Sequence, residues 1–476
     1  MSLPKDFIWG FGTASYQIEG AIKQDGRGPS IWDTHCDKPG AIADGSSGEI
    51  ACDSYNRTAE DIALLKSYGA KAYRFSISWS RVIPLGGRND PINDQGLNHY
   101  VQFVDDLLAA GIQPLVTLYQ WDLPEALHQR YRGPLNKDEF VADFTNYARI
   151  MFRALSPKVK IFMTFTEPWV ISIFGYQNGL FAPGRSSDRT VCAEGDSTRE
   201  QWIVGHNLLL AHASAAKVYR EEFKPTSEGE IGLTNLGDWA YPYDKNNEKD
   251  REAANRFVEF CLGWFTDPIY LGDYPKSMRE QLGDRLPKFT SEEAALVKDS
   301  NDFFGLDYYT ANYIKHADTP AADTDFMGNL EKSWVNSDGQ VIGPESQHVR
   351  MRPNPQGLRA LLNWIHKRYN GPKIYLVENG TSVKGENDLP MIEAINDEFR
   401  CDFYRGHIDA VVQARMQDGV NVGSYVAWSL LDNFEWTDGY ATRFGVTYVD
   451  YKDGQKRYPK KSAKLLSKIF DSYIEK

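Results

Sequence analysis

The sequence predicts an α/β fold, a single (β/α)8 or TIM barrel with long loops at one face, formed by residues 1–476 as one domain. Short apolar runs that suit buried parallel strands alternate with longer amphipathic stretches along the whole chain, as in α/β folds. The first run leads into Gly12-Thr13-Ala14-Ser15. This is not the glycine-rich phosphate turn that usually follows the first strand of a doubly wound sheet. No linker-like segment divides the chain, and barrels of this kind often exceed the usual domain size.

Eight short runs are expected to form the strands of the barrel. They are rich in β-branched and aromatic residues, and nearly continuous apolar runs are typical of strands buried on both faces. In chain order they are Phe7–Phe11, Ala72–Ser76, Gln113–Leu118, Ile161–Thr166, Ile231–Asn235, Phe303–Tyr308, Lys373–Val377 and Val422–Trp428.

The stretches between these strands are amphipathic and predict helices. The clearest are Thr58–Ser67, Leu97–Ala110, Phe140–Leu155, Trp202–Phe223 and Phe399–Asp418. Several polar, loop-like stretches also follow predicted strands. Loops in that position form the active-site face of a barrel, so we expect them to surround its entrance. These loops are Pro39–Gly48, Gly184–Arg199, Pro242–Asp250 and Thr319–Gly343.

The composition is that of a globular protein with a large core, with 42% hydrophobic and 25% charged residues. Aromatic residues make up 13% of the chain, an excess that suits a pocket in which flat apolar faces, such as those of sugar rings, are stacked. The net charge of −12 argues against nucleic acids and anionic membranes as partners, because both require basic patches. No apolar run is long enough for a transmembrane helix.

The five cysteines are widely spaced and form no Cys-x-x-Cys or Cys/His pattern. We therefore expect reduced thiols and no zinc or other metal site. The segment Met1–Phe7 lacks the apolar stretch of a signal peptide, which favours a cytoplasmic location.

Two glutamates far apart in the sequence each follow a predicted strand. Glu167 precedes a proline and Glu378 precedes an Asn-Gly pair, and such residues end strands. Both carboxylates should therefore lie at the C-terminal ends of barrel strands, where this fold carries its chemistry. A pair of carboxylates in this position suits an acid/base and a nucleophile for glycosidic bonds. For either glutamate alone, a strand-end carboxylate that binds turn amides is the simpler interpretation.

Further motifs lie at the ends of the predicted strands. They are Phe7-x-Trp9-Gly10, Gln17-Ile18-Glu19-Gly20, Tyr73-Arg74-Phe75-Ser76, Gln120-Trp121-Asp122-Leu123-Pro124, Trp428-Ser429-Leu430 and Asn433-Phe434-Glu435-Trp436. Together with Thr166-Glu167-Pro168 and Glu378-Asn379-Gly380, they resemble the family 1 glycoside hydrolases, and fungal intracellular β-glucosidases in particular. The resemblance extends from Phe7 to about Phe470.

The resemblance implies a retaining β-glycosidase that hydrolyses terminal non-reducing β-D-glycosides by double displacement, without a cofactor. It implies that Glu378 is the nucleophile, that Glu167 is the acid/base, and that Arg74 supports the nucleophile. The partner is then a small-molecule carbohydrate or aryl glycoside. The substrate-binding residues that it implies are Gln17, Gln120, Trp121, Thr166, Asp307, Tyr309, Trp428, Glu435, Trp436 and Phe444.

The chemistry of these two roles sets opposite demands on the carboxyl groups. Glu378 must be ionised to attack the anomeric carbon, and a nearby Arg74 would lower its pKa. Glu167 must begin protonated, so burial and the charge of Glu378 must raise its pKa. A separation of about 5–5.5 Å between the carboxyl groups would retain the anomeric configuration.

The chain departs from the family pattern at three positions of the expected −1 subsite. Gln120 stands where the family has His, and Thr166 and Asp307 stand where it has Asn. Two adjacent carboxylates cannot both ionise cheaply. We therefore expect Asp307 to be protonated, to be paired with Arg74 or another cation, or to bind a cationic group of the substrate.

These departures leave alternatives open beside a plain β-glucosidase with a drifted subsite. One is a β-glycosidase specific for a sugar altered at C2 or C3, such as a 2-amino sugar, which would make the protein exo-β-glucosaminidase-like. Another is a catalytically weak carbohydrate-binding protein, although a pure binder does not need both glutamates. No His-x-His pattern supports a metal-dependent barrel hydrolase.

Overall fold

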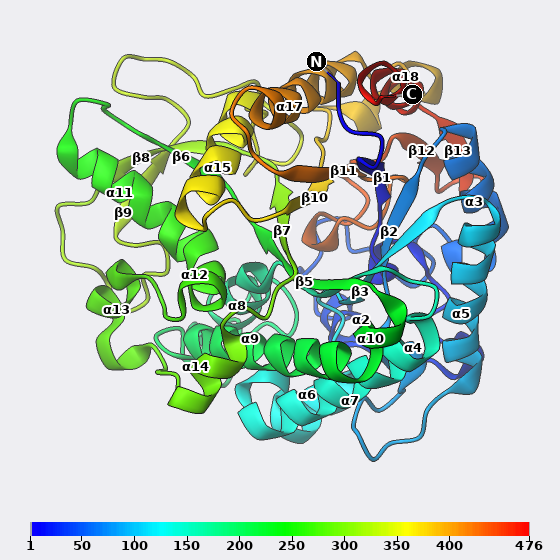
Figure 1. Cartoon of the computed structure of the whole chain (residues 1–476), viewed down its shortest axis with the longest axis horizontal. Coiled ribbons are helices and arrows are strands. Elements are labelled where there is room, and N and C mark those ends of the chain that lie inside the picture. Colours follow the sequence, from blue (N-terminus) through cyan, green and yellow to red (C-terminus); the bar gives the residue numbers. More distant parts are fainter. Residues whose placement is uncertain (1, 476) are drawn as a thin grey trace.

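Eight parallel strands close into a barrel in the computed structural model, which describes residues 2–475 (Figure 1). β1 completes the barrel by pairing with both β2 and β11. The predicted fold class and its eight strands are confirmed, with small changes at the strand ends. The barrel strands are β1 (Ile8–Gly12), β2 (Ala72–Ser76), β3 (Gln113–Tyr119), β4 (Ile161–Thr166), β5 (Glu230–Leu236), β7 (Phe303–Tyr308), β10 (Ile374–Asn379) and β11 (Val422–Trp428).

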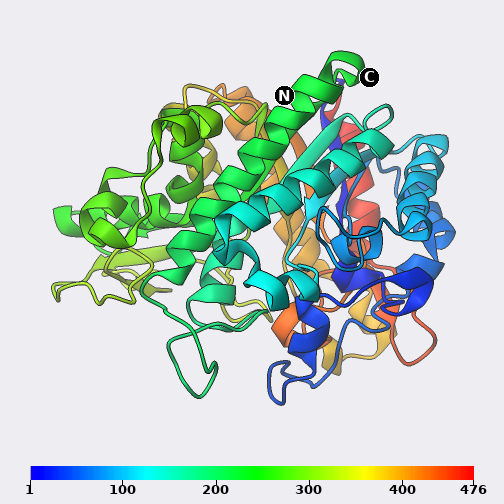
Figure 2. The same ribbon diagram turned by 90° about the horizontal axis from the view of Figure 1, so that it is seen from below.

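Helices form a layer around the barrel (Figures 1 and 2). They include all five stretches predicted as helical, and α9 is continued by a π-helical turn at Tyr219–Phe223. Among residues 2–475, no helix combines the length and hydropathy that crossing a bilayer requires. The helices are α1 (Ser15–Ile18), α2 (Ile31–Cys36), α3 (Thr58–Ser67), α4 (Trp79–Val82), α5 (Asp94–Ala109), α6 (Glu125–Tyr131), α7 (Lys137–Leu155), α8 (Pro168–Tyr176), α9 (Glu200–Val218), α10 (Lys224–Ser227), α11 (Glu248–Val258), α12 (Trp264–Leu271), α13 (Lys276–Leu282), α14 (Ser291–Val297), α15 (Pro355–Arg368), α16 (Met391–Ala394), α17 (Glu398–Met416) and α18 (Lys461–Tyr473).

Two small sheets outside the barrel were not predicted. β6 (Trp239–Pro242), β8 (Ala311–His316) and β9 (Leu330–Ser333) form one, and β12 (Thr447–Asp450) pairs with β13 (Lys456–Pro459) in the other. The prediction of an unstructured loop was wrong at Leu330–Ser333. This strand is short and exposed at its centre, so it carries no hydrophobic alternation to signal it.

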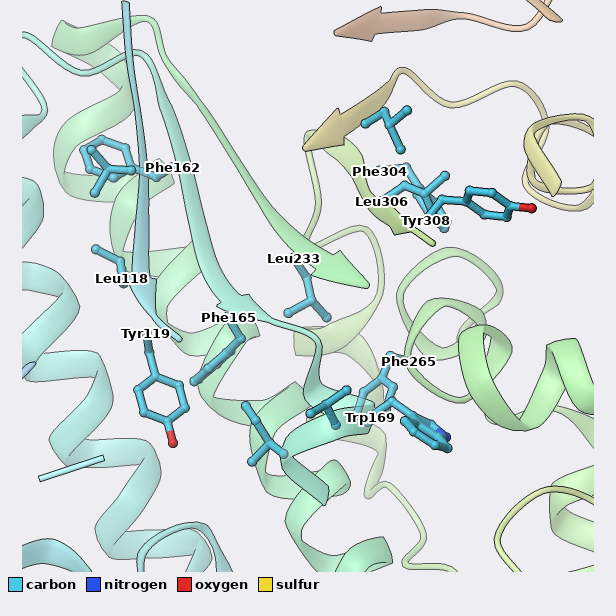
Figure 3. Packing of buried hydrophobic residues seen from close by; sticks show 14 of the residues in the cluster. Leu118, Tyr119, Phe162, Phe165, Trp169, Leu233, Phe265, Phe304, Leu306 and Tyr308 are labelled. Carbon is cyan, nitrogen blue, oxygen red and sulfur yellow. The ribbon is translucent and has the colours of Figure 1, made fainter. Parts of the chain in front are cut away.

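The strands are buried from both sides, which explains their nearly continuous apolar sequences. Inside the barrel, Ile161 and Met163 of β4 belong to a small apolar cluster. Outside it, Phe162 and Phe165 of the same strand join the large cluster beneath the helices (Figure 3). The ring of Phe165 stacks on Phe144 of α7 at 4.3 Å between centroids.

The pairing register breaks just before each of the two glutamates, in β4, which ends directly before Glu167, and in β10, which contains Glu378. The pairing of β4 with β5 shifts between Met163 and Thr166, and the pairing of β10 with β7 shifts between Leu376 and Glu378. Such irregularities re-aim side chains beside active sites. On β4, Thr164 binds His212 of α9 at 2.7 Å, whereas Thr166 contacts Arg74 of β2 inside the barrel mouth.

The two ends of the described chain lie side by side (Figure 2). The backbone N–H of Leu3 donates to the carbonyl of Tyr473 at 2.6 Å, and the N–H of Glu475 donates back to the carbonyl of Leu3. Phe470 of α18 stacks on Trp9 of β1 at 4.8 Å. The final helix therefore packs against the first strand of the barrel.

A buried network of charges fixes the segment that follows β11. The ammonium of Lys460 binds Asp432 at 2.8 Å and Glu386 at 2.5 Å. Arg443 pairs with Asp432, and Arg400 of α17 pairs with Glu386. All five side chains are nearly inaccessible to water. Buried charges of this kind must be fully paired, so the network holds the loop between β11 and β12 in one position.

Replacing Lys460 by methionine should destabilise the protein strongly. The change leaves Glu386 and Asp432 short of one buried positive charge, which costs about 3–5 kcal/mol of the free energy of unfolding. Chemical denaturation of both proteins measures the difference.

The neighbouring residue supplies a matched control. Lys461 pairs with Glu398 at the surface, and Lys461→Met should leave the free energy of unfolding nearly unchanged. Equal losses in the two variants would show that the buried network has no special role.

Candidate active site

A pocket opens at the C-terminal ends of the barrel strands, and most of the site residues predicted from the sequence line it. Aromatic side chains from several strand ends and loops form its walls, as is usual for pockets that bind small molecules. The predicted residues that line it are Gln120, Trp121, Glu167, Tyr309, Glu378, Trp428, Glu435, Trp436 and Phe444.

The other predicted residues lie behind this wall, fully shielded from water. Gln17 of α1 donates to Glu435 at 3.2 Å. Arg74 of β2 contacts Glu378 and Thr166, and Asp307 on β7 pairs in register with Glu378 on β10. They therefore support lining residues from beneath.

Among the carboxyl groups at the pocket, Glu378 has the most hydrogen-bond donors. Arg74 Nη1 and Gln120 Nε2 contact Oε1, the latter at 3.4 Å, and the hydroxyl of Tyr309 donates to Oε2 at 2.7 Å. Burial raises the pKa of Glu378, while the Arg74 charge and the Tyr309 hydrogen bond oppose this rise. The expected lowering by Arg74 is thus present, but burial outweighs it. These donors stabilise the ionised form.

Glu167 lies in a different environment. It directly precedes α8, its backbone is left-handed with φ of 47°, and among residues 2–475 no donor contacts its carboxyl group. Burial, the charge of Glu378 and the charge of Asp238 raise the pKa of Glu167 well above its usual value. Two glutamates in one pocket are therefore biased toward opposite protonation states.

The carboxyl groups of Glu167, Asp307 and Glu378 converge. One oxygen of each lies within 4.8 Å of an oxygen of the other two. For Glu167 and Glu378, this spacing fits a direct displacement, because enzymes that use an intervening water molecule hold the two carboxyl groups farther apart. The same three carboxyl groups are those that could hold a cation, although Arg74 already contacts one of them.

Of the alternatives expected for Asp307, pairing with Arg74 is wrong. The guanidinium uses its N–H groups on Thr117, Glu378 and Thr166. Both carboxyl oxygens of Asp307 are buried without a hydrogen-bond partner in the described part of the chain. Burial, the charge of Glu378 and the charge of Glu167 raise the pKa of Asp307 well above its usual value, which favours its protonated form.

Gln17 and Glu435 form a second polar group at the pocket. Gln17 Nε2 also donates to Asn433 and to the carbonyl of Phe434, which leaves its buried Oε1 free to accept within the described structure. Burial and the charges of Asp438 and Glu378 raise the pKa of Glu435. These groups offer both donors and acceptors to a polyol.

Aromatic rings surround these polar groups. Trp121 lies 4.5 Å from Trp436 and 5.5 Å from Phe181 between ring centroids, and Trp121 Nε1 donates to the carbonyl of Thr166 at 3.0 Å. The backbone at Trp121 and Trp436 is in the left-handed conformation, with φ of 72° and 50°. Non-glycine residues in this region are strained by about 1–3 kcal/mol each and concentrate at functional sites.

Several pocket residues were missed by the sequence interpretation. Phe174 and Phe181 follow Glu167 along the chain, and their aromatic character close to a predicted catalytic residue was the available signal. Asp238, directly beyond β5, has a pKa raised to about 6 by burial. His348 and Arg350 come from the loop before α15, and no sequence pattern marks them. Trp169, two residues after Glu167, also lines the pocket.

Comparison with known proteins agrees with this geometry. Residues 1–473 match the model of the family described as glycosyl hydrolase family 1. The chain belongs to this family.

Its relatives include fungal and plant enzymes. The chain is 54% identical over 472 residues to beta-glucosidase 1B of Phanerodontia chrysosporium, which covers 99% of this chain and 86% of that protein. A Humicola insolens beta-glucosidase, solved in complex with glucose, is 62% identical with a TM-score of 0.99, covering 100% and 99% of the two chains. A rice beta-glucosidase mutant, solved in a covalent complex with Glc, is 41% identical with a TM-score of 0.94, covering 100% and 99%.

Replacing Tyr309 by phenylalanine should move the acidic limb of the kcat/KM profile to higher pH. The lost hydroxyl helps to keep the pKa of Glu378 down, so a higher pH is needed to ionise that carboxyl group. A hydrogen bond to a charged group contributes about 1.5–3 kcal/mol, and kcat/KM at the optimum should fall by about 10- to 100-fold. The pH dependence of aryl glycoside hydrolysis measures both effects.

Tyr308 provides the control, because its hydroxyl binds the carbonyl of Asn354 instead, at 2.7 Å. Tyr308→Phe should leave the acidic limb in place. An unchanged limb in Tyr309→Phe would contradict the assigned role of this hydrogen bond.

Proposed function

We propose that this protein is a retaining β-glucosidase that hydrolyses terminal non-reducing β-D-glucosides through a glycosyl-enzyme intermediate. The observation that carries the proposal is the pair of buried glutamates with oxygens within 4.8 Å, of which only Glu378 receives hydrogen-bond donors. The named relatives are beta-glucosidases and give no support to the binding-protein alternative. The expected absence of a cofactor remains part of this proposal.

In the first step, the ionised Glu378 attacks the anomeric carbon while Glu167 gives its proton to the leaving oxygen. The bond to the leaving group breaks as the ester bond to Glu378 forms, and the alcohol departs with the proton. Arg74 and Tyr309 hold the attacking carboxylate in position.

In the second step, Glu167 changes from acid to base. Formation of the ester removes the negative charge of Glu378, which was one cause of the raised pKa of Glu167. Glu167 can then accept a proton from water, and the resulting attack releases the sugar with its original anomeric configuration. The charge of Glu378 thus favours proton donation by Glu167 in the first step, and its loss favours proton uptake by Glu167 in the second.

We further propose that Trp428 stacks on the sugar ring and that Gln17, Glu435 and Trp436 bind its distal hydroxyls. The aromatic residues at the entrance, including Phe174 and Phe181, would receive an aryl or sugar leaving group. The Humicola relative solved with glucose supports a carbohydrate partner. Five cysteines without a disulfide support a reducing, cytoplasmic location.

The two glutamates should differ in their response to the leaving group. Glu167→Gln removes the acid, so kcat/KM should fall by about 10²- to 10⁴-fold on alkyl glucosides. It should fall far less on 2,4-dinitrophenyl glucoside, whose leaving group needs no proton. Glu378→Gln should lose about 10⁴-fold or more on every substrate. Steady-state kinetics on a series of leaving groups makes this comparison.

The proposal fails if Glu167→Gln is impaired equally on all leaving groups, or if NMR of the first-formed product shows inversion. Thermal melting of each variant serves as the folding control, because both substitutions keep the shape of the side chain.

A further inference from the structure

Asp307 has no assigned part in the two steps of β-glucoside hydrolysis described above. Its carboxyl group is completely buried, lies within 4.8 Å of both catalytic glutamates, and has two oxygens without a partner among residues 2–475. A buried polar group is normally hydrogen-bonded. An unpartnered carboxyl group directly beside the two glutamates of a substrate pocket therefore points to a missing ligand.

A second observation is independent of the acidic cluster. The side chain of Gln120 is only 2% exposed, and its Nε2 donates toward Glu378 at 3.4 Å. This orientation leaves Oε1 of Gln120 buried and without a donor in the described structure. Acceptors from two strand ends, Gln120 in the pocket wall and Asp307 behind it, therefore lack a donor among residues 2–475.

The charges around Asp307 leave one positive charge to be supplied. Arg74 contacts Glu378 and balances its negative charge, and Glu167 must carry a proton at the start of the reaction. Asp307 then faces no cation of its own, since the groups around it are Glu378, Glu167, Arg74 and the neutral Tyr309. The raised pKa of Asp307 favours its protonated form in the free protein, and an ammonium group of the substrate could take the place of that proton.

The position of the cluster identifies the substrate atom concerned. Double displacement places the anomeric carbon between Glu167 and Glu378, and Asp307 lies beside both. Of the two ring atoms bonded to the anomeric carbon, the ring oxygen carries no substituent. The group that Asp307 can reach is therefore the substituent at C2.

We propose that Asp307 and Gln120 form a subsite for an ammonium group at C2, so that this protein accepts β-glycosides of 2-amino-2-deoxy sugars. This inference rests on the proposed function and specifies its substrate class. A divalent cation suits the site less well, because the guanidinium of Arg74 contacts Glu378 directly and would lie beside the added charge.

Direct binding tests the subsite without relying on turnover. Isothermal titration calorimetry at pH 6.5 compares glucosamine with glucose, which differ at this position by an ammonium in place of a hydroxyl. Glucosamine should bind at least about tenfold more tightly, and Asp307→Asn should reduce this ratio to about one. Equal affinities for the two sugars in the unaltered protein would overturn the proposal.

Turnover provides the second readout. The ratio of kcat/KM for p-nitrophenyl 2-amino-2-deoxy-β-glucoside to that for the β-glucoside should fall at least about tenfold in Asp307→Asn. Asp238→Asn removes another carboxyl group of the same pocket and should leave the ratio unchanged. If thermal melting shows that Asp307→Asn is folded and the ratio is nevertheless unaltered, the proposal is overturned.

Two further outcomes distinguish failure of the ammonium subsite from failure of the proposed hydrolysis. If neither glycoside is hydrolysed, the proposed function is wrong, and calorimetry still decides whether the ammonium subsite exists. If EDTA abolishes glucoside hydrolysis and a divalent cation restores it, the carboxyl cluster is a metal site and the ammonium proposal is wrong.

Discussion

The contact between Arg74 and Glu378 is the interaction on which the rest of the site depends. Three carboxyl groups converge within 4.8 Å of one another, and only one of them receives the guanidinium. Burial raises the pKa of all three, whereas the contact with Arg74 and the weaker donors Tyr309 and Gln120 favour the ionised form of Glu378 alone. The ion pair therefore biases three neighbouring carboxyl groups toward one anion and two acids.

The fold holds this arrangement through constraints outside the pocket. The register breaks on β4 and β10 turn the side chains before both glutamates. The left-handed backbone at Trp121, Glu167 and Trp436 stores strain that the surrounding packing must offset. Beneath the β11–β12 loop, the charges around Lys460 are fully paired, so the loop that carries Glu435 cannot move independently of the barrel.

The sequence predicted the barrel because the strands are buried on both faces and several surrounding helices, such as α5, α7 and α15, on one, and such patterns are local. It also predicted Glu167 and Glu378, since a carboxylate between an apolar run and a strand breaker is visible in the sequence. It could not predict the partners of Arg74, because the direction of guanidinium hydrogen bonds depends on neighbouring strands. His348 and Arg350 were missed for a similar reason, since only the path of a long loop brings them to the pocket.

The carboxyl group bound by Arg74 should be the one that forms the bond to the sugar. Incubation with a 2-deoxy-2-fluoro-β-glucoside that carries a reactive leaving group, followed by mass spectrometry of the intact protein and its peptides, tests it directly. With Glu378 as the nucleophile, the expected result is the mass increase of one fluoroglucosyl group, attached to Glu378. Attachment to Glu167 or Asp307 would contradict it, as would hydrolysis with inversion and no attached sugar.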